Sequence, residues 1–163
     1  MSDSFAVHGR VGSDGSPEFY DTATGAAVFN IRAKGNVQYA KVTMTAAQIL
    51  ALNATPVTIL AAPGAGLSLY VHAMALYLNF GTAAFQSGTT VTFKQGTATL
   101  ATTTAALING GASALIQPAF PAEGTTASLG ANNSAITANT TVAFTTGDST
   151  VDVHIWYSLL TTP

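Results

Sequence analysis

The feature that most constrains this 163-residue chain is one dense apolar run between Gly66 and Gly81. With 14 residues from Leu67 to Phe80, including His72 and Asn79, the run is too short and too polar for the ~20 residues that span a bilayer. Bounded by glycine at each end, it predicts the long central strand of a β-sandwich.

Both faces of this predicted strand are largely apolar. The odd-numbered face would carry Leu67, Leu69, Val71, Ala73, Ala75, Tyr77 and Asn79. The even-numbered face would carry Ser68, Tyr70, His72, Met74, Leu76, Leu78 and Phe80. A sheet with one face in water alternates apolar with polar residues. We therefore expect both faces to be covered, the second by another sheet or another subunit.

The rest of the body predicts short strands separated by turns. Thr45 and Gln48 form a capping box that begins a short helix over 46–52. Two hairpins are expected, one joining 89–94 to 97–104 and one joining 139–146 to 150–160. Further strands are expected at 57–62 and 114–117. The fold class is therefore all-β, a sandwich of about eight antiparallel strands with one short helix.

Charge is scarce and unevenly placed. Asp, Glu, Lys and Arg make up 7% of the residues, and eight of the twelve lie in residues 1–41. The body presents no basic field, so we expect no nucleic-acid partner. With no cysteine, the chain has no disulfide, thiolate nucleophile or Cys-ligated zinc site. Its start lacks the basic and apolar regions of a secretory signal, which indicates synthesis in a cytoplasm, and we expect no membrane partner.

Residues 1–40 predict an extended N-terminal arm, and residues 41–163 the sandwich domain. Segments 5–11 and 27–32 have strand character, and 12–17 is a turn cluster. One interpretation is a flexible tail. The other is an arm that docks on a partner through its aromatic and basic side chains. These are Phe5, Arg10, Phe19, Tyr20, Phe29, Arg32 and Lys34.

No motif for catalysis appears in the chain. His8, His72 and His154 match no metal-binding spacing. Asp152 and His154 would share a strand face like the orienter and base of a triad, but no serine lies on a nucleophile elbow. Gly64-Ala-Gly66 is a turn between strands, with no following helix to bind phosphate. We therefore predict no catalytic, cofactor or metal site and no small-molecule substrate.

Three passages resemble small structural proteins of tailed bacteriophages. They are 41–66 (KVTMTAAQILALNATPVTILAAPGAG), 75–85 (ALYLNFGTAAF) and 155–157 (IWY). Such proteins include capsid decoration (cement) proteins and related head-fibre and tail-fibre modules. The resemblance implies a jelly-roll body, commonly trimeric, on the outside of the virion and in contact with the capsid shell. It implies no catalytic residue.

The expected function is that of a virion structural protein made in the host bacterial cytoplasm. As a decoration protein it would bind the outer capsid surface and stabilise contacts between capsomers of the major capsid protein. We expect a homotrimer whose subunit interface includes Tyr70, His72, Met74, His154 and Trp156. The alternative is a head-fibre or tail-fibre module that binds a receptor or glycan on a platform of Trp156, Tyr70 and Tyr77.

Overall fold

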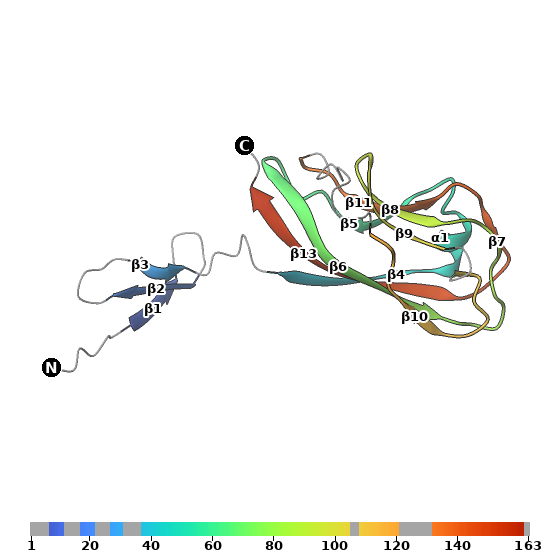
Figure 1. The fold of residues 1–163 in the computed structure, drawn as a ribbon, viewed down its shortest axis with the longest axis horizontal. Helices are drawn as coiled ribbons and strands as arrows, with labels where there is room; N and C mark the ends of the chain where they lie inside the picture. The colour runs from blue at the N-terminus through green and yellow to red at the C-terminus, as the bar shows by residue number, and fades with distance from the viewer. Residues whose placement is uncertain are drawn as a thin grey trace. The chain divides into compact units, whose positions relative to one another are not determined.

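The computed structural model describes residues 7–11, 17–21, 27–30, 37–104, 108–120 and 132–161 (Figure 1). It divides the chain into two compact units, residues 1–36 and residues 37–163. In the first unit, β1 (Val7–Val11), β2 (Pro17–Asp21) and β3 (Ala27–Asn30) form an antiparallel sheet in that order. Residues 38–40, which we assigned to the arm, lie in the first strand of the second unit.

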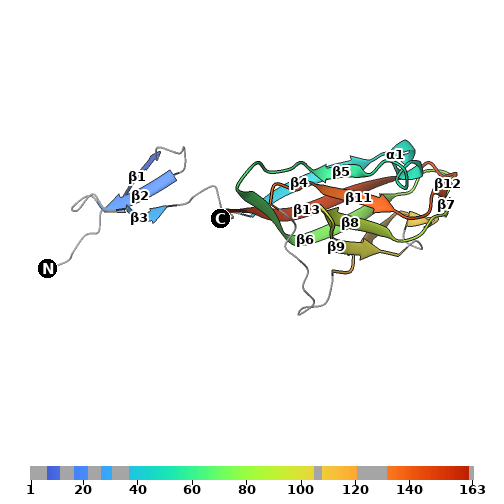
Figure 2. The same ribbon diagram turned by 90° about the horizontal axis from the view of Figure 1, so that it is seen from above.

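The second unit is a sandwich of two four-stranded antiparallel sheets (Figures 1 and 2). The first sheet has the order β10 (Ala114–Ile116), β6 (Leu67–Asn79), β13 (Thr150–Thr161), β4 (Gln38–Met44). The second has the order β5 (Val57–Leu60), β11 (Ile136–Thr140), β8 (Val91–Gln95), β9 (Ala98–Thr103). This is the strand order of a jelly roll, so the predicted all-β class and topology are confirmed.

Smaller elements lie at the end of the sandwich where β4 ends (Figures 1 and 2). The helix α1 (Ala46–Leu50) begins at Thr45, whose hydroxyl accepts from the Gln48 amide while the Gln48 side chain accepts from the Thr45 amide, so the predicted capping box is confirmed. The two-residue strands β7 (Gln86–Ser87) and β12 (Phe144–Thr145) pair with each other. Among the described residues, no helix is long and apolar enough to cross a membrane.

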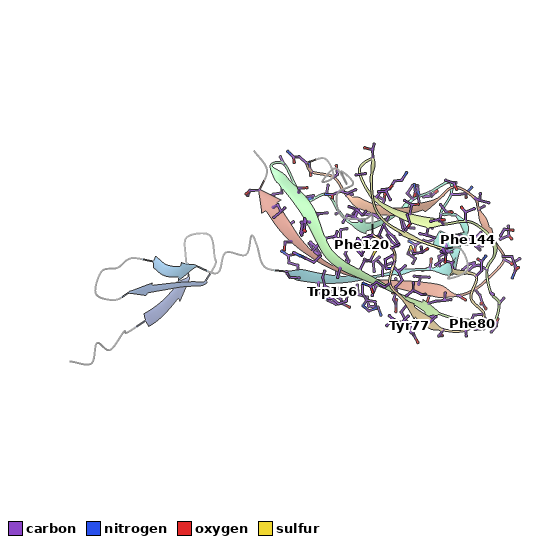
Figure 3. The ribbon with its side chains drawn as sticks, viewed as in Figure 1. Tyr77, Phe80, Phe120, Phe144 and Trp156 are labelled. Atoms are coloured by element: carbon purple, nitrogen blue, oxygen red, sulfur yellow. The ribbon has the colours of Figure 1, made fainter. Side chains whose placement is uncertain are left out.

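The hydrophobic core lies between the two sheets. Large side chains from both sheets and from the loops are almost fully buried there, among them Met44, Leu76, Phe85, Phe93, Ile136 and Ile155. Near α1 the Phe85 and Phe144 rings meet edge to face, with centroids 6.0 Å apart, and Figure 3 shows Phe144 at that end of the sandwich. All of these residues come from the second unit, which therefore has a core of its own.

The central strand β6 contains a bulge at His72 that explains its two apolar faces. Trp156 of β13 pairs with Ala73 and Tyr157 pairs with Val71, so His72 has no opposite residue. A single extra residue exchanges the two faces of a strand. The core therefore receives Leu69 and Val71 before the bulge and Met74, Leu76 and Leu78 after it. The predicted split into odd and even faces is wrong, because it assumed unbroken alternation.

The predicted hairpin between 139–146 and 150–160 is also wrong. β11 ends at Thr140 and pairs with β5 and β8, whereas β13 pairs with β4 and β6 in the other sheet. Between them the chain leaves the sheet, and the Thr140 hydroxyl donates to the carbonyl of Val142. Consecutive strands of a jelly roll can lie in opposite sheets, and in the segment between these two the Phe144 ring packs edge to face against Phe85. The other predicted hairpin, β8 with β9, is confirmed.

Candidate functional site

The outer face of the β10–β6–β13–β4 sheet is the strongest candidate for a functional surface. The term outer face is used below for the side of this sheet that points away from the second sheet. Strand register places its residues in rows that cross the sheet. One row is Thr43, Asp152, Tyr77 and Leu115; the next is Lys41, His154 and Ala75; the third is Tyr39, Trp156 and Ala73.

Large apolar and aromatic side chains are exposed across this face. Leu115 is 72% exposed, Tyr39 53%, Tyr70 41% and Tyr77 37%. Trp156 and His154 are half-buried between them. Figure 3 shows Trp156 and Tyr77 on the side of the sheet away from β8 and β11. The outer face thus presents aromatic surface to solvent at a position where an isolated sandwich would carry polar residues.

Tyr39 ties two of these aromatic residues together. Its hydroxyl lies 2.8 Å from Nδ1 of His154, and its ring stacks on the imidazole with centroids 6.0 Å apart. The Tyr39 ring also leans on Trp156, with centroids 5.3 Å apart. These contacts hold the three rings in fixed positions, so the surface they form is preorganised for a partner.

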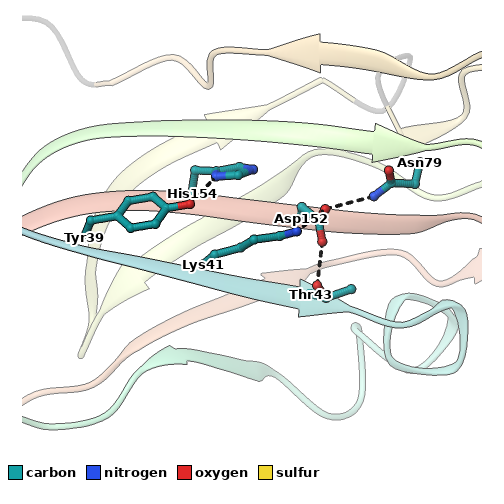
Figure 4. Close-up of polar contacts among 6 residues, drawn as sticks. All are labelled: Tyr39, Lys41, Thr43, Asn79, Asp152 and His154. Atoms are coloured by element: carbon teal, nitrogen blue, oxygen red, sulfur yellow. Dashed lines mark hydrogen bonds and ion pairs between the residues drawn. The ribbon is translucent and has the colours of Figure 1, made fainter.

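Asp152 forms the polar centre of the outer face (Figure 4). Its carboxylate accepts from the Thr43 hydroxyl at 2.5 Å and from Nδ2 of Asn79 at 3.1 Å, and it pairs with Nζ of Lys41 at 2.9 Å. Burial alone raises the pKa of Asp152, but these three hydrogen bonds and the charge of Lys41 outweigh it and lower the pKa to about 2. The carboxylate is therefore ionised and fully partnered at neutral pH.

Beyond the bulge, the outer face continues with Tyr70 and His72. Nε2 of His72 lies 2.7 Å from the hydroxyl of Ser158, and the Tyr70 ring meets the imidazole edge to face at 4.9 Å. His72 covers Ser158, which is buried although it lies on the outer face. The bulge residue is thus held as part of the aromatic surface.

A groove of about 350 Å³ runs along β6 within the outer face. Its floor includes the small side chains of Ala73 and Ala75, with Trp156 on one side and Leu115 and Gln117 on the other. A second hollow of about 460 Å³ lies between α1 and the start of β5 and carries no charged side chain.

The exposed side of the second sheet has a different character. Its strands place Thr58, Thr92, Lys94, Thr137 and Asn139 outward, while alternate residues such as Phe93 and Ala138 are buried. This clean alternation of apolar and polar residues is typical of a sheet that faces water. The two outer sides of the sandwich therefore differ: among its described strands, only those of the first sheet place aromatic side chains outward.

The structure brings four of the five predicted interface residues together and separates the fifth. Tyr70, His72, His154 and Trp156 all lie on the outer face. Met74 is 1% exposed and lies in the core, because the bulge reverses the alternation between it and Tyr70. Met74 therefore cannot contact a partner.

Sequence reasoning missed Tyr39, Lys41 and Leu115. Tyr39 and Lys41 fell at the boundary we drew between arm and body, although Tyr39, Lys41 and Thr43 alternate with the inward-facing Ala40 and Val42 as a half-buried strand requires. Leu115 lies on a three-residue strand, which is too short to show a period.

The predicted arm residues are only partly described. Arg10 lies on β1, Phe19 and Tyr20 on β2, and Phe29 on β3. Phe5, Arg32 and Lys34 lie outside the described residues.

Among the residues described, no group of three or more His, Cys, Asp or Glu side chains is placed to hold a metal ion. Asp152 and His154 do share a face, but they have different partners: Asp152 bonds Thr43, Asn79 and Lys41, and His154 bonds Tyr39. The pair does not have the arrangement of an orienter and a base.

Comparisons of the chain with family models, with curated proteins and with solved structures find no match.

Proposed function

We propose that this chain is a structural protein of a bacteriophage virion, of the capsid decoration type that its sequence resembles. In this role it binds the outer surface of the capsid and stabilises the contacts between capsomers of the major capsid protein. The single observation that carries the proposal is the aromatic outer face of the β10–β6–β13–β4 sheet.

The chemistry of the outer face supports a protein partner. Tyrosine and tryptophan are enriched at the buried centres of protein interfaces, where charged residues are depleted. On the outer face the lysine and the aspartate nearest the rings, Lys41 and Asp152, neutralise each other at 2.9 Å. A partner that covers this surface therefore buries aromatic area without leaving an unpaired charge.

The low charge of the body favours a fixed place in an assembly. A freely diffusing domain normally carries more charge, which keeps it soluble. The same argument favours self-association, and the resemblance implies a homotrimer. The jelly roll occurs in viral capsid proteins, in lectins and in cupins, so the fold agrees with the proposal by analogy only.

The test uses virions of the phage that encodes the chain. Mass spectrometry of purified particles should detect the chain, and labelled antibody should mark intact heads. Particles that lack the chain should bind the purified protein and resist heat or osmotic shock better once it is bound. Absence from purified particles would refute the virion role.

Paired variants then test the outer face. Tyr77→Ala combined with Leu115→Ala removes aromatic and apolar area there, and we expect binding to particles to weaken by about 10-fold or more. Thr58→Ala combined with Thr137→Ala also truncates two outward-facing side chains, on the opposite sheet, and should leave binding unchanged. Equal loss in both would mean that the outer face is not the binding surface.

A second function, a head-fibre or tail-fibre module that binds glycans, is favoured by the groove along β6. Trp156 forms one wall and the alanine floor leaves room for a flat ring, which is how sugars stack on aromatic side chains. Gln117, in the opposite wall, supplies amide donors and acceptors. Tyr70 and Tyr77, which we predicted as part of the glycan platform, do not line this groove. A glycan array should therefore show binding that Trp156→Ala abolishes and that Tyr70→Ala retains. No bound glycan at high protein concentration would exclude this function.

A further inference from the structure

We propose that the free edge of β4 pairs with the β4 edge of a second copy of this chain, which joins two sandwiches through one continuous sheet. This contact is separate from the binding of a capsid by the outer face. The observation behind it concerns the four edges of the two sandwich sheets: among the described residues, three of these edges are protected against strand addition and the fourth is not.

A sheet edge exposes unpaired backbone N–H and C=O groups that attract another strand, and native proteins protect such edges. β10 has only three residues. β5 has four residues and follows Pro56. β9 has a bulge opposite Phe93 and Lys94, and Ala119 bonds to both backbone groups of Thr102. Each of these edges is short, preceded by proline, or bulged and partly covered.

β4 has none of these protections. It has seven residues, pairs with β13 in unbroken register, and contains neither proline nor glycine. Within the described part of the chain, no strand pairs with its other side. A lysine often protects an edge, but Lys41 lies on the outer face and is bound to Asp152 at 2.9 Å. Among the described strands, this edge is therefore regular, long and unpaired.

Exposed apolar side chains accompany this open edge. Val37, directly before β4, is 57% exposed, and Tyr39, the second residue of β4, is 53% exposed. A partner strand would cover them. The edge therefore offers both backbone groups and side-chain surface.

The sequence of β4 is complementary to itself in one antiparallel register. When the two strands pair about Ala40, Tyr39 lies opposite the partner's Lys41, and Val37 lies opposite the partner's Thr43. The ammonium group is then near an aromatic face, which is favourable. A register centred on Lys41 instead of Ala40 would place the two copies of Lys41 directly opposite each other, which is unfavourable.

A second copy is the preferred occupant because β4 is complementary to itself and the other three edges of the sandwich are protected. Head-to-tail pairing would need β4 to bind β5, β9 or β10 of a neighbour. Two-fold pairing of β4 with itself needs only the one open edge, and it closes after two copies, so it produces no fibre. It predicts assemblies with an even number of chains: a dimer, or a hexamer if the outer face forms trimers.

Disulfide trapping tests the register directly, because the full chain contains no cysteine. Ala40→Cys places a thiol at the two-fold point. Opposite residues of an antiparallel pair have Cα atoms about 4.5–5.5 Å apart, which is within the range that a disulfide spans. Under mild oxidation we expect most of the variant to migrate at twice the 16.5-kDa mass of the chain on a non-reducing gel. Ala98→Cys, on the protected edge β9, should remain a single chain.

A second variant keeps the test decisive if Ala40→Cys folds poorly. Tyr39→Lys places lysine opposite the partner's Lys41 twice, and native mass spectrometry should show the even-numbered assembly lost. Tyr70→Lys makes the same chemical change on the outer face away from β4 and should preserve it.

Three results would overturn the inference: a monomeric wild type, a trimer that forms no disulfide in Ala40→Cys, or equal crosslinking of Ala40→Cys and Ala98→Cys. None of them bears on capsid binding, which is measured separately on particles. A chain that crosslinks through position 40 but is absent from virions would refute the proposed function alone.

Discussion

At the scale of single residues, the unusual feature is that a protein with so few charges buries one of them. Asp152 is 9% exposed in the middle of a sheet face. An ionised carboxylate in such a place is costly unless donors surround it. Thr43, Asn79 and Lys41 supply those donors from the two neighbouring strands. The network therefore links β4, β13 and β6 through side chains in addition to the backbone ladder.

The lowered pKa of Asp152 makes part of the stability depend on pH. A carboxyl group whose folded-state pKa lies below its ordinary value of 3.8 stabilises the fold above that value. The contribution is lost as the pH falls from about 3.8 to about 2. Asp152→Asn should therefore cost about 1–2 kcal/mol at pH 7, allowing for solvent screening, and much less at pH 2.

Urea unfolding of the wild type and of Asp152→Asn, followed from pH 7 to pH 2, measures this difference. Other carboxyl groups titrate equally in both proteins and cancel in the comparison. A difference that stays constant across this pH range would show that the charge of Asp152 contributes nothing.

Asp148 is a second carboxylate with a structural role, in this case in a loop. It accepts from the hydroxyl and amide of Thr82 and from the amide of Ala83. The side-chain bond from Thr82 and then the backbone bonds from Ala83 and Thr82 lower the pKa of Asp148. Gly81 is required beside it, because a Cβ there would lie 2.3 Å from Oδ1 of Asp148.

Gly81→Ala should displace the Asp148 carboxylate and release the two amides that it holds. Hydrogen exchange at Thr82 and Ala83 is then expected to become about 10-fold faster at neutral pH. Gly111→Ala is the matched control, since a Cβ at Gly111 meets no atom within 4 Å. Unchanged protection at Thr82 and Ala83 in Gly81→Ala would mean that the carboxylate does not hold this loop.

At the scale of elements, features marked by local sequence signals could be predicted, whereas features that depend on pairing between distant strands could not. The capping box at Thr45 and the strands β6, β8 and β13 were predictable, because periodicity and turn residues mark them locally. The bulge at His72 was not, because it is visible only in the pairing of β6 with β13. Because the prediction did not include this bulge, it placed Met74, one of the five predicted interface residues, on the wrong face.

Deletion of His72 provides a test of the bulge. Without it, Val71 follows a regular step from Ala73, and every other residue of β6 keeps its present face. We expect the variant to fold and to lose about 1 kcal/mol, mainly from the bond between His72 and Ser158. Chemical denaturation gives the change in the free energy of unfolding.

Deletion of Tyr77 is the matched control, since it removes an exposed residue from the same strand. It turns Leu76 and Met74, each 1% exposed, out of the core. Each costs about 2–5 kcal/mol, and together they approach the whole stability of a typical domain. Equal effects of the two deletions would contradict the account of β6 given above.

At the scale of the whole molecule, the chain combines a self-sufficient sandwich with a small separate unit. Among the residues whose burial the structure describes, the core is built from residues after 37, with contributions from both sheets, α1 and the loops. The jelly-roll topology was expected from the resemblance, and the strand order confirms it. The predicted boundary lay after residue 40 and not after residue 36, because β4 begins in a stretch whose charges and aromatic residues resemble those of the preceding segment.

Because the core lies wholly in the second unit, residues 37–163 should fold without the first. We expect the free energy of unfolding of this fragment to match that of the sandwich in the full chain within about 0.5 kcal/mol.

If residues 1–36 form a docking arm, the fragment should bind phage particles more weakly than the full chain while keeping its β4 edge contact. Denaturation measures the first expectation, particle binding the second, and disulfide trapping at Ala40 the third. A fragment that binds particles as well as the full chain would assign the whole of capsid recognition to the outer face, whereas a fragment that fails to fold would show that the first unit stabilises the sandwich.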